Sequence, residues 1–132
     1  MSTFDHQRLD VYRRSIDFIA LAEEIVGDLP RGRSYVADQL RRAAVSIALN
    51  IAEGAGEFSP TDKARFYRIA RRSATECAAI LDICERLELA CGGHVASGQG
   101  MLGETISMLV VLIRTCESRS GGKGRGMGKG RG

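Results

Sequence analysis

Apolar side chains recur every three or four residues through most of the chain, and no segment shows the alternation with a period of two that is typical of strands. This pattern predicts four amphipathic helices, over about residues 10–29, 34–53, 60–90 and 101–118. Four such helices joined by short breaks favour an all-α, up-down four-helix bundle.

Local signals mark where several of these helices begin and end. Asp10 and Ser34 are suitable N-cap residues for the first two helices. Ser59 followed by Pro60 is a stronger start signal, because serine caps well and proline is favoured at the first helical position. Gly54 is expected to end the second helix, since glycine readily adopts the left-handed conformation found at helix ends.

The second predicted helix is apolar on two opposite sides. One stripe is formed by Val36, Leu40, Ala43, Ile47 and Ile51, and the other by Val45, Ala48, Leu49 and Ala52. A helix that is apolar on both sides must be covered on both sides. We therefore expect the first stripe to face the core of the bundle and the second to form an interface between copies of the chain.

The third and fourth predicted helices each carry one apolar stripe. These stripes are Phe66, Ala70, Ala74, Cys77, Leu81 and Cys84 in the third helix and Leu102, Ile106, Leu109, Ile113 and Cys116 in the fourth. The glycine-rich residues 91–100 are predicted to form the loop between them. The chain thus divides into a helical bundle, residues 1–118, and a basic glycine-rich tail, residues 119–132, which cannot bury a core and is expected to be disordered.

Hydropathy and cysteine content indicate the compartment. No run of about 18 apolar residues occurs, and the N-terminus lacks the apolar core of a signal peptide, so we expect a cytoplasmic protein that does not span a membrane. The cysteines are Cys77, Cys84, Cys91 and Cys116. The first three recur every seven residues, too far apart on one helix for a disulfide, and we interpret them as small core side chains in a reducing compartment.

Motifs for metal binding and catalysis are missing from the sequence. No Cys-x-x-Cys pair occurs, and His6 and His94 are not placed to complete a zinc site, so neither a metal nor a cofactor is expected. The glycine spacing of residues 98–103 matches a dinucleotide-binding fingerprint, but that motif requires a preceding strand. No catalytic residue is predicted. Structural roles, such as hydrogen bonds across helices, are predicted for Asn50, Glu53, Ser73 and Glu76.

Charge is strongly segregated along a chain whose formal net charge is +3. Residues 31–72 carry nine basic and four acidic side chains, and residues 118–132 carry five basic and no acidic ones. The other two segments, 1–30 and 73–117, are net acidic. Segregation of this kind matters more for the choice of partner than the total charge.

Basic residues of the two positive segments are the candidate nucleic-acid-binding residues: Arg41, Arg42, Arg65, Arg68, Arg71, Arg72, Lys123, Arg125, Lys129 and Arg131. Arg65, Arg68 and Arg72 share one helix face, because they are spaced at i, i+3 and i+7. Only Asp62 and Glu76 flank this run, so neutralisation within the helix is poor. A solvated helix face, and for the tail a solubilising terminus, are the alternative interpretations.

Three segments carry a family resemblance. They are Gln39-Leu40-Arg41-Arg42-Ala43-Ala44-Val45-Ser46-Ile47, Asn50-Ile51-Ala52-Glu53-Gly54 and Arg65-Phe66-Tyr67-Arg68-Ile69-Ala70-Arg71-Arg72-Ser73-Ala74-Thr75-Glu76. They resemble bacterial four-helix-bundle proteins that include proteins encoded in intervening sequences of 23S ribosomal RNA genes. The accessory variability determinant of diversity-generating retroelements is a more distant relative. The resemblance covers about residues 4–118 and departs from the family at Ala48, where proline is usual, and at Arg72, where a small residue is usual.

The resemblance implies a ring-like homopentamer without enzymatic activity. In retroelement-associated relatives, a basic surface engages a reverse transcriptase and nucleic acid. We therefore expect a non-enzymatic, oligomeric accessory protein that binds the phosphates of RNA or DNA, with a reverse transcriptase as a candidate partner. A protein-interaction scaffold that does not bind nucleic acid is the alternative hypothesis.

Overall fold

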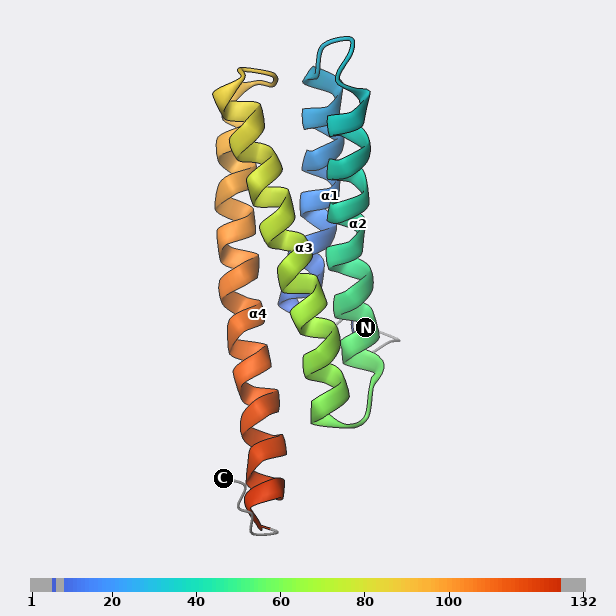
Figure 1. Ribbon diagram of the computed structural model, residues 1–132, viewed down its shortest axis with the longest axis vertical. Coiled ribbons are helices and arrows are strands. Elements are labelled where there is room, and N and C mark those ends of the chain that lie inside the picture. The colour runs from blue at the N-terminus through green and yellow to red at the C-terminus, as the bar shows by residue number, and fades with distance from the viewer. Residues whose placement is uncertain (1–5, 7–8, 127–132) are drawn as a thin grey trace.

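The chain folds as four antiparallel helices in a computed structural model that describes residue 6 and residues 9–126, with side chains as far as residue 121 (Figure 1). The helices are α1 (Asp10–Asp28), α2 (Ser34–Gly56), α3 (Pro60–Arg86) and α4 (Gly92–Gly126), and the described residues contain no strand. Each helix packs against its neighbours in the cyclic order α1–α2–α3–α4, and the last returns to α1. The predicted up-down four-helix bundle is thereby confirmed.

The helix starts differ in detail from the sequence predictions. Ser59 caps α3 as expected, because its Oγ accepts a hydrogen bond from the backbone N–H of Asp62 at 3.0 Å. The N-cap of α1 is Leu9 rather than Asp10, and that of α2 is Arg33 rather than Ser34. Asp10 is the first residue inside α1, where its charge still complements the positive end of the helix dipole.

The core is built from the predicted stripes. The five residues from Val36 to Ile51 of the first α2 stripe are all buried. The α4 stripe is buried at four of its five positions, with Ile106 partly exposed. In α3 the predicted Phe66 is only partly buried, and Ala64 and Tyr67 lie in the core instead. The buried side of α3 in its first two turns is therefore rotated slightly from the side that the sequence predicted.

Gly54 does not end α2, because the helix continues to Gly56. Gly54 is instead buried at a close crossing with α3. A Cβ at this position would lie 2.6 Å from Cε1 of Tyr67 and 3.2 Å from the backbone oxygen of Lys63. The need for glycine here is therefore steric, and the carbonyls at the end of α2 are capped by Lys63, whose Nζ donates to the backbone oxygens of Gly54 and Ala55.

The predicted glycine-rich loop is wrong, because residues 92–100 form the first turns of α4. A glycine in a helix costs about 1 kcal/mol relative to alanine. Tertiary packing offsets this cost at Gly98, which is buried against α3 and α1: a Cβ there would lie 2.7 Å from Cδ1 of Leu81 and 3.5 Å from Cε1 of Phe18. The fingerprint spacing of residues 98–103 thus lies on a helix, with no strand before it in the described chain.

α4 also extends further than predicted at its other end. The helix continues to Gly126, eight residues beyond the predicted end at 118, so the expected disorder of the tail is wrong for residues 119–126. Residues 127–132 lie outside the described residues. Cys116 is buried, and Thr61 and Ser120 share a hydrogen bond of 2.8 Å between α3 and α4. These contacts pack the turns of α4 near Cys116 and Ser120, and each residue added to the helix beyond them contributes one backbone hydrogen bond.

The segment Gly92–Gly121 of α4 is long and apolar enough to cross a membrane by length and composition alone, with a mean hydropathy of 1.3 in its most apolar window. The sequence prediction found no such segment, because its glycines and hydroxyl residues interrupt every apolar run. In the structure the apolar stripe of this helix packs on α1 and α3, as the core-facing side of a bundle helix does.

Candidate functional site

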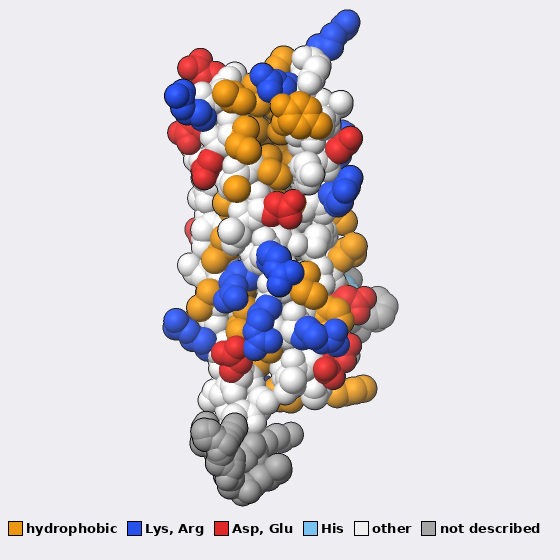
Figure 2. Space-filling view, in the orientation of Figure 1, with side chains coloured by type: hydrophobic (Ala, Val, Ile, Leu, Met, Phe, Trp, Pro, Cys, Tyr) orange, Lys and Arg blue, Asp and Glu red, His pale blue; other side chains and the backbone are white. Residues whose placement is uncertain are grey.

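Arginines gather on the outer side of α3 and on the adjacent turn of α4. Figure 2 shows Lys and Arg side chains concentrated on the lower half of the face that α3 presents to the viewer. We define the basic face as Arg65, Arg68, Arg71 and Arg72 of α3 with Arg114 of α4. All are exposed except Arg71, which is half-buried.

Arg114 joins this face because of the register of two antiparallel helices. Arg68 of α3 pairs with Glu117 of α4 at 2.6 Å. Three residues further along α3 and three residues back along α4, Arg71 and Arg114 come to the same level. The sequence prediction missed Arg114, because only the pairing of α3 with α4 reveals its neighbours.

The basic face is only partly neutralised. Besides the Arg68–Glu117 pair, Arg65 lies 3.8 Å from Asp62 and stacks over Phe66 at 4.6 Å from the ring centroid. No carboxylate in the described part of the chain forms an ion pair with Arg71, Arg72 or Arg114. Three positive charges therefore remain available to an anion.

The other predicted basic residues lie elsewhere. Arg41 faces α1, where its guanidinium donates two hydrogen bonds to Glu23, at 2.9 and 3.0 Å. These bonds hold the pKa of Glu23 below its ordinary value and raise the pKa of Arg41. Arg42 is exposed on the outer side of α2. Lys123 and Arg125 belong to the last turns of α4, but their side chains lie outside the described part of the structure. Lys129 and Arg131 lie entirely outside the described residues.

The predicted structural polar residues fall into two groups. Ser73 shares a hydrogen bond of 2.8 Å with Ser46 across the α2–α3 seam, and Asn50 donates to the backbone oxygen and to Oγ of Ser46, at 2.9 and 3.1 Å. Glu53 and Glu76 are exposed, and neither forms a hydrogen bond within the described chain. The seam therefore depends on two serines and one amide, without the carboxylates.

The second apolar stripe of α2 is only partly available for an interface. Val45 and Leu49 are 41% and 60% exposed, and Ala52 is half-buried. Ala48 is 4% exposed, so its predicted place in an interface between chains is wrong: the bundle itself covers it. The exposed members lie in a shallow groove on α2 with the polar rim of Asp38, Arg41, Arg42, Ser46 and Asn50.

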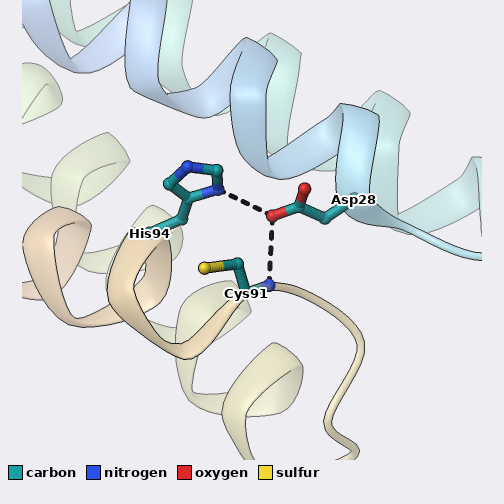
Figure 3. Close-up of side chains that lie close together, drawn as sticks. All are labelled: Asp28, Cys91 and His94. Carbon is teal, nitrogen blue, oxygen red and sulfur yellow. Dashed lines mark hydrogen bonds and ion pairs between the residues drawn. The ribbon is translucent and has the colours of Figure 1, made fainter.

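A polar cluster that the sequence did not predict joins the end of α1 to the start of α4. Figure 3 shows Asp28 between Cys91 and His94. Oδ2 of Asp28 accepts the backbone N–H of Cys91 at 3.0 Å and lies 2.7 Å from Nδ1 of His94. These two bonds hold the pKa of the Asp28 carboxyl below its ordinary value. Cys91 is exposed, which corrects its assignment to the buried cysteine stripe, because α3 ends at Arg86 and Cys91 lies in the turn that follows.

Comparison with known proteins places the fold. A crystal structure from Bacteroides thetaiotaomicron, of a protein with unknown function from the S23 ribosomal protein family, matches with a TM-score of 0.72 and 23% sequence identity. The match covers 78% of this chain and 97% of that chain, and it shows a shared fold. No curated protein matches the sequence. The family described as 23S rRNA-intervening sequence protein matches residues 7–111, which confirms the resemblance seen in the sequence. The chain therefore belongs to the 23S rRNA-intervening sequence protein family.

Proposed function

We propose that the protein is a non-enzymatic, oligomeric accessory protein of the cytoplasm that binds RNA or DNA through the basic face. The observation that supports this most directly is the group formed by Arg71, Arg72 and Arg114, which come from two helices and have no ion-pair partner among the described residues. Arginine suits phosphate because its planar guanidinium donates paired hydrogen bonds and remains charged.

Binding of this kind reads the nucleic-acid backbone rather than the bases. The basic face lies along the outer sides of two packed helices and offers a surface to phosphates, whereas proteins that read bases insert a helix or a strand into a groove. Phosphate contacts position a protein without carrying sequence information. We therefore expect similar affinity for unrelated sequences, with a reverse transcriptase as a candidate protein partner beside the nucleic acid.

The test is fluorescence anisotropy with single-stranded RNA and duplex DNA across a salt series. Replacing Arg71 and Arg72 with Gln should weaken binding and reduce the slope of log K against log salt by about 0.7 to 0.9 for each phosphate that the variant no longer neutralises. The matched control replaces Arg31 and Arg86 with Gln. Replacing these exposed arginines removes the same net charge from the opposite end of the bundle, so the slope of log K against log salt should change much less.

The contribution of the C-terminal basic residues needs a truncation that spares the bundle. Ending the chain after Gly121 removes Lys123, Arg125, Lys129 and Arg131 while keeping the hydrogen bond between Thr61 and Ser120. Binding should weaken and the helical circular-dichroism signal should fall only by the few residues removed. No binding at low salt, or binding unchanged by both the arginine replacements and the truncation, would refute the proposal.

We further propose that copies of the chain associate through the outer side of α2. Val45 and Leu49 are apolar, exposed and rimmed by charged side chains, as expected for an interface between subunits. A ring, five-membered by the family resemblance, would repeat the basic face in each subunit, so that weak contacts add through multivalency. Leu49→Asp would bury an unpaired charge in this interface and should yield monomers in sedimentation velocity. A wild-type protein that is already monomeric at tens of micromolar (about the usual assay range) would refute the proposed association.

A protein-interaction scaffold is the second candidate function. It is favoured by a further set of exposed apolar side chains, Tyr35, Ile83 and Leu87, at 59%, 48% and 48% exposure. Since Ser46 meets Ser73, the antiparallel register brings the first turn of α2 and the last turns of α3 to the same end of the bundle. Oligomerisation without nucleic-acid binding in the anisotropy series would favour this function.

A further inference from the structure

We propose that Asp28, Cys91 and His94 form a binding site for a transition-metal ion of the Zn²⁺ type, at the corner where the end of α1 meets the start of α4. One ligand atom from each residue lies within 4.8 Å of the others. In a tetrahedral site, ligand atoms about 2.0 to 2.3 Å from zinc are roughly 3.3 to 3.8 Å apart. Side-chain movements of about 1 Å would bring the ligand atoms to these spacings. The atoms that lie furthest apart must approach, whereas Oδ2 of Asp28 and Nδ1 of His94, which are 2.7 Å apart, must separate around the ion.

The backbone fixes two of the ligands on one side of a helix start. The backbone oxygen of Cys91 accepts the N–H of Val95 at 3.0 Å, so Cys91 directly precedes the first turn of α4. His94 follows three residues later and lies above Cys91 on the same side of the helix. The third ligand, Asp28, is the last residue of α1, and its hydrogen bond to the Cys91 N–H holds the two helix ends together.

A carboxylate lies beside each ring nitrogen of His94, and the two carboxylates orient the imidazole ring. Nδ1 faces Oδ2 of Asp28 at 2.7 Å, and Nε2 lies 3.4 Å from Oε1 of Glu24, one turn earlier on α1. If Nδ1 binds the metal, Nε2 carries the proton and donates it to Glu24. A carboxylate behind a ligating histidine is the arrangement that fixes the tautomer and ring orientation in metal sites.

The surrounding charge favours a cation. Glu24 and Asp28 contribute two carboxylates, and neither is paired with a lysine or arginine in the described part of the chain. A thiolate, an imidazole and a carboxylate are ligands that zinc accepts, whereas Mg²⁺ and Ca²⁺ prefer oxygen alone. Three protein ligands would leave a fourth position for water, and the exposure of Cys91 leaves the site open to solvent.

The site is separate from the basic face. His94 and Arg114 are 20 residues apart on α4, which corresponds to about 30 Å along the helix. The proposal therefore does not depend on nucleic-acid binding. Metal bound here would link α1 to the turn between α3 and α4 and should stabilise the folded bundle.

The experiment titrates Zn²⁺ alone into the reduced, chelator-treated full chain without an affinity tag, by calorimetry, with Co²⁺ as a spectroscopic probe. We expect one ion per chain and a thiolate-to-cobalt charge-transfer band. Cys91→Ser and His94→Gln should each weaken Zn²⁺ binding at least 10-fold, and Glu24→Gln about 10-fold. Cys116→Ser, which alters a buried thiol within α4, is the matched control and should leave binding unchanged.

Thermal unfolding provides a second readout. At the same Zn²⁺ concentration, the melting temperature of the wild type and of Cys116→Ser should rise more than that of Cys91→Ser. Binding that Cys91→Ser leaves unaltered, or a Co²⁺ spectrum of the wild type without a thiolate band, would overturn the proposal. The cluster would then be only a hydrogen-bonded cap in which Asp28 anchors the start of α4. The wild-type Co²⁺ spectrum decides this even if a ligand variant fails to fold.

Discussion

Gly54→Ala is expected to destabilise the bundle, although alanine is the better helix former. The added methyl group would lie 2.6 Å from Cε1 and 2.9 Å from Cδ1 of Tyr67, and 3.2 Å from the backbone oxygen of Lys63. Tyr67 is only 3% exposed, so its ring has little room to move, and the backbone oxygen cannot be displaced without shifting α3. Overpacking of a core costs about 1 to 3 kcal/mol, and this site belongs to the upper half of that range.

The helix-propensity gain offsets part of that cost. Replacing glycine by alanine inside a helix stabilises it by at most about 1 kcal/mol. The net expectation for Gly54→Ala is therefore a decrease of about 1 to 2 kcal/mol in the free energy of unfolding. Gly56→Ala is the matched control, because it lies two residues away in the same helix with no atom within 4 Å of an added Cβ. It should be neutral or stabilising by up to about 1 kcal/mol.

Urea unfolding followed by circular dichroism measures both variants. A double-mutant cycle with Tyr67→Leu then tests the cause, since a smaller side chain at 67 frees the space that the methyl group needs. In that background Gly54→Ala should cost less than in the wild type. An equal cost in both backgrounds, or a Gly54→Ala variant as stable as Gly56→Ala, would refute the steric argument.

Burial and pairing lead to three further predictions. Burial raises the pKa of the Cys77 thiol to about 12. A thiol reagent at pH 8 (about half a unit below the ordinary thiol pKa) should therefore modify the exposed Cys91 rapidly. Cys77 should react only in denaturant, where all four cysteines react. Ser73→Ala should lower the free energy of unfolding by about 1 kcal/mol in urea titrations, because it removes a hydrogen bond between α2 and α3. Arg41 lowers the pKa of Glu23, so the stability difference between the wild type and Glu23→Gln should be present above pH 4.5, the ordinary pKa of that group, and vanish as the pH falls through the lower value in the folded state.

Helical periodicity alone determined the architecture. The stripe that contains Leu40, Ile47 and Ile51 is buried because a helix with one strongly apolar side can hide it only against other helices. The local signal at Ser59 and Pro60 also predicted the start of α3 to the residue, since a capping hydroxyl acts within one turn. The arginines spaced along one side of α3 were likewise visible, because they lie on a single element.

Tertiary structure decided whatever depends on two elements meeting. Glycine in a helix is unfavourable in isolation, so residues 92–100 were predicted as a loop, and only the close approach of Leu81 to Gly98 makes a helix the better packing there. Arg41 was grouped with the α3 arginines by sequence, but α1 supplies the carboxylate that neutralises it. Asp28 and His94 are 66 residues apart in the chain, and no local pattern could place them 2.7 Å from each other. Short-range periodicity records which side of a helix is buried, whereas pairing and coordination depend on which residues of another helix that side meets.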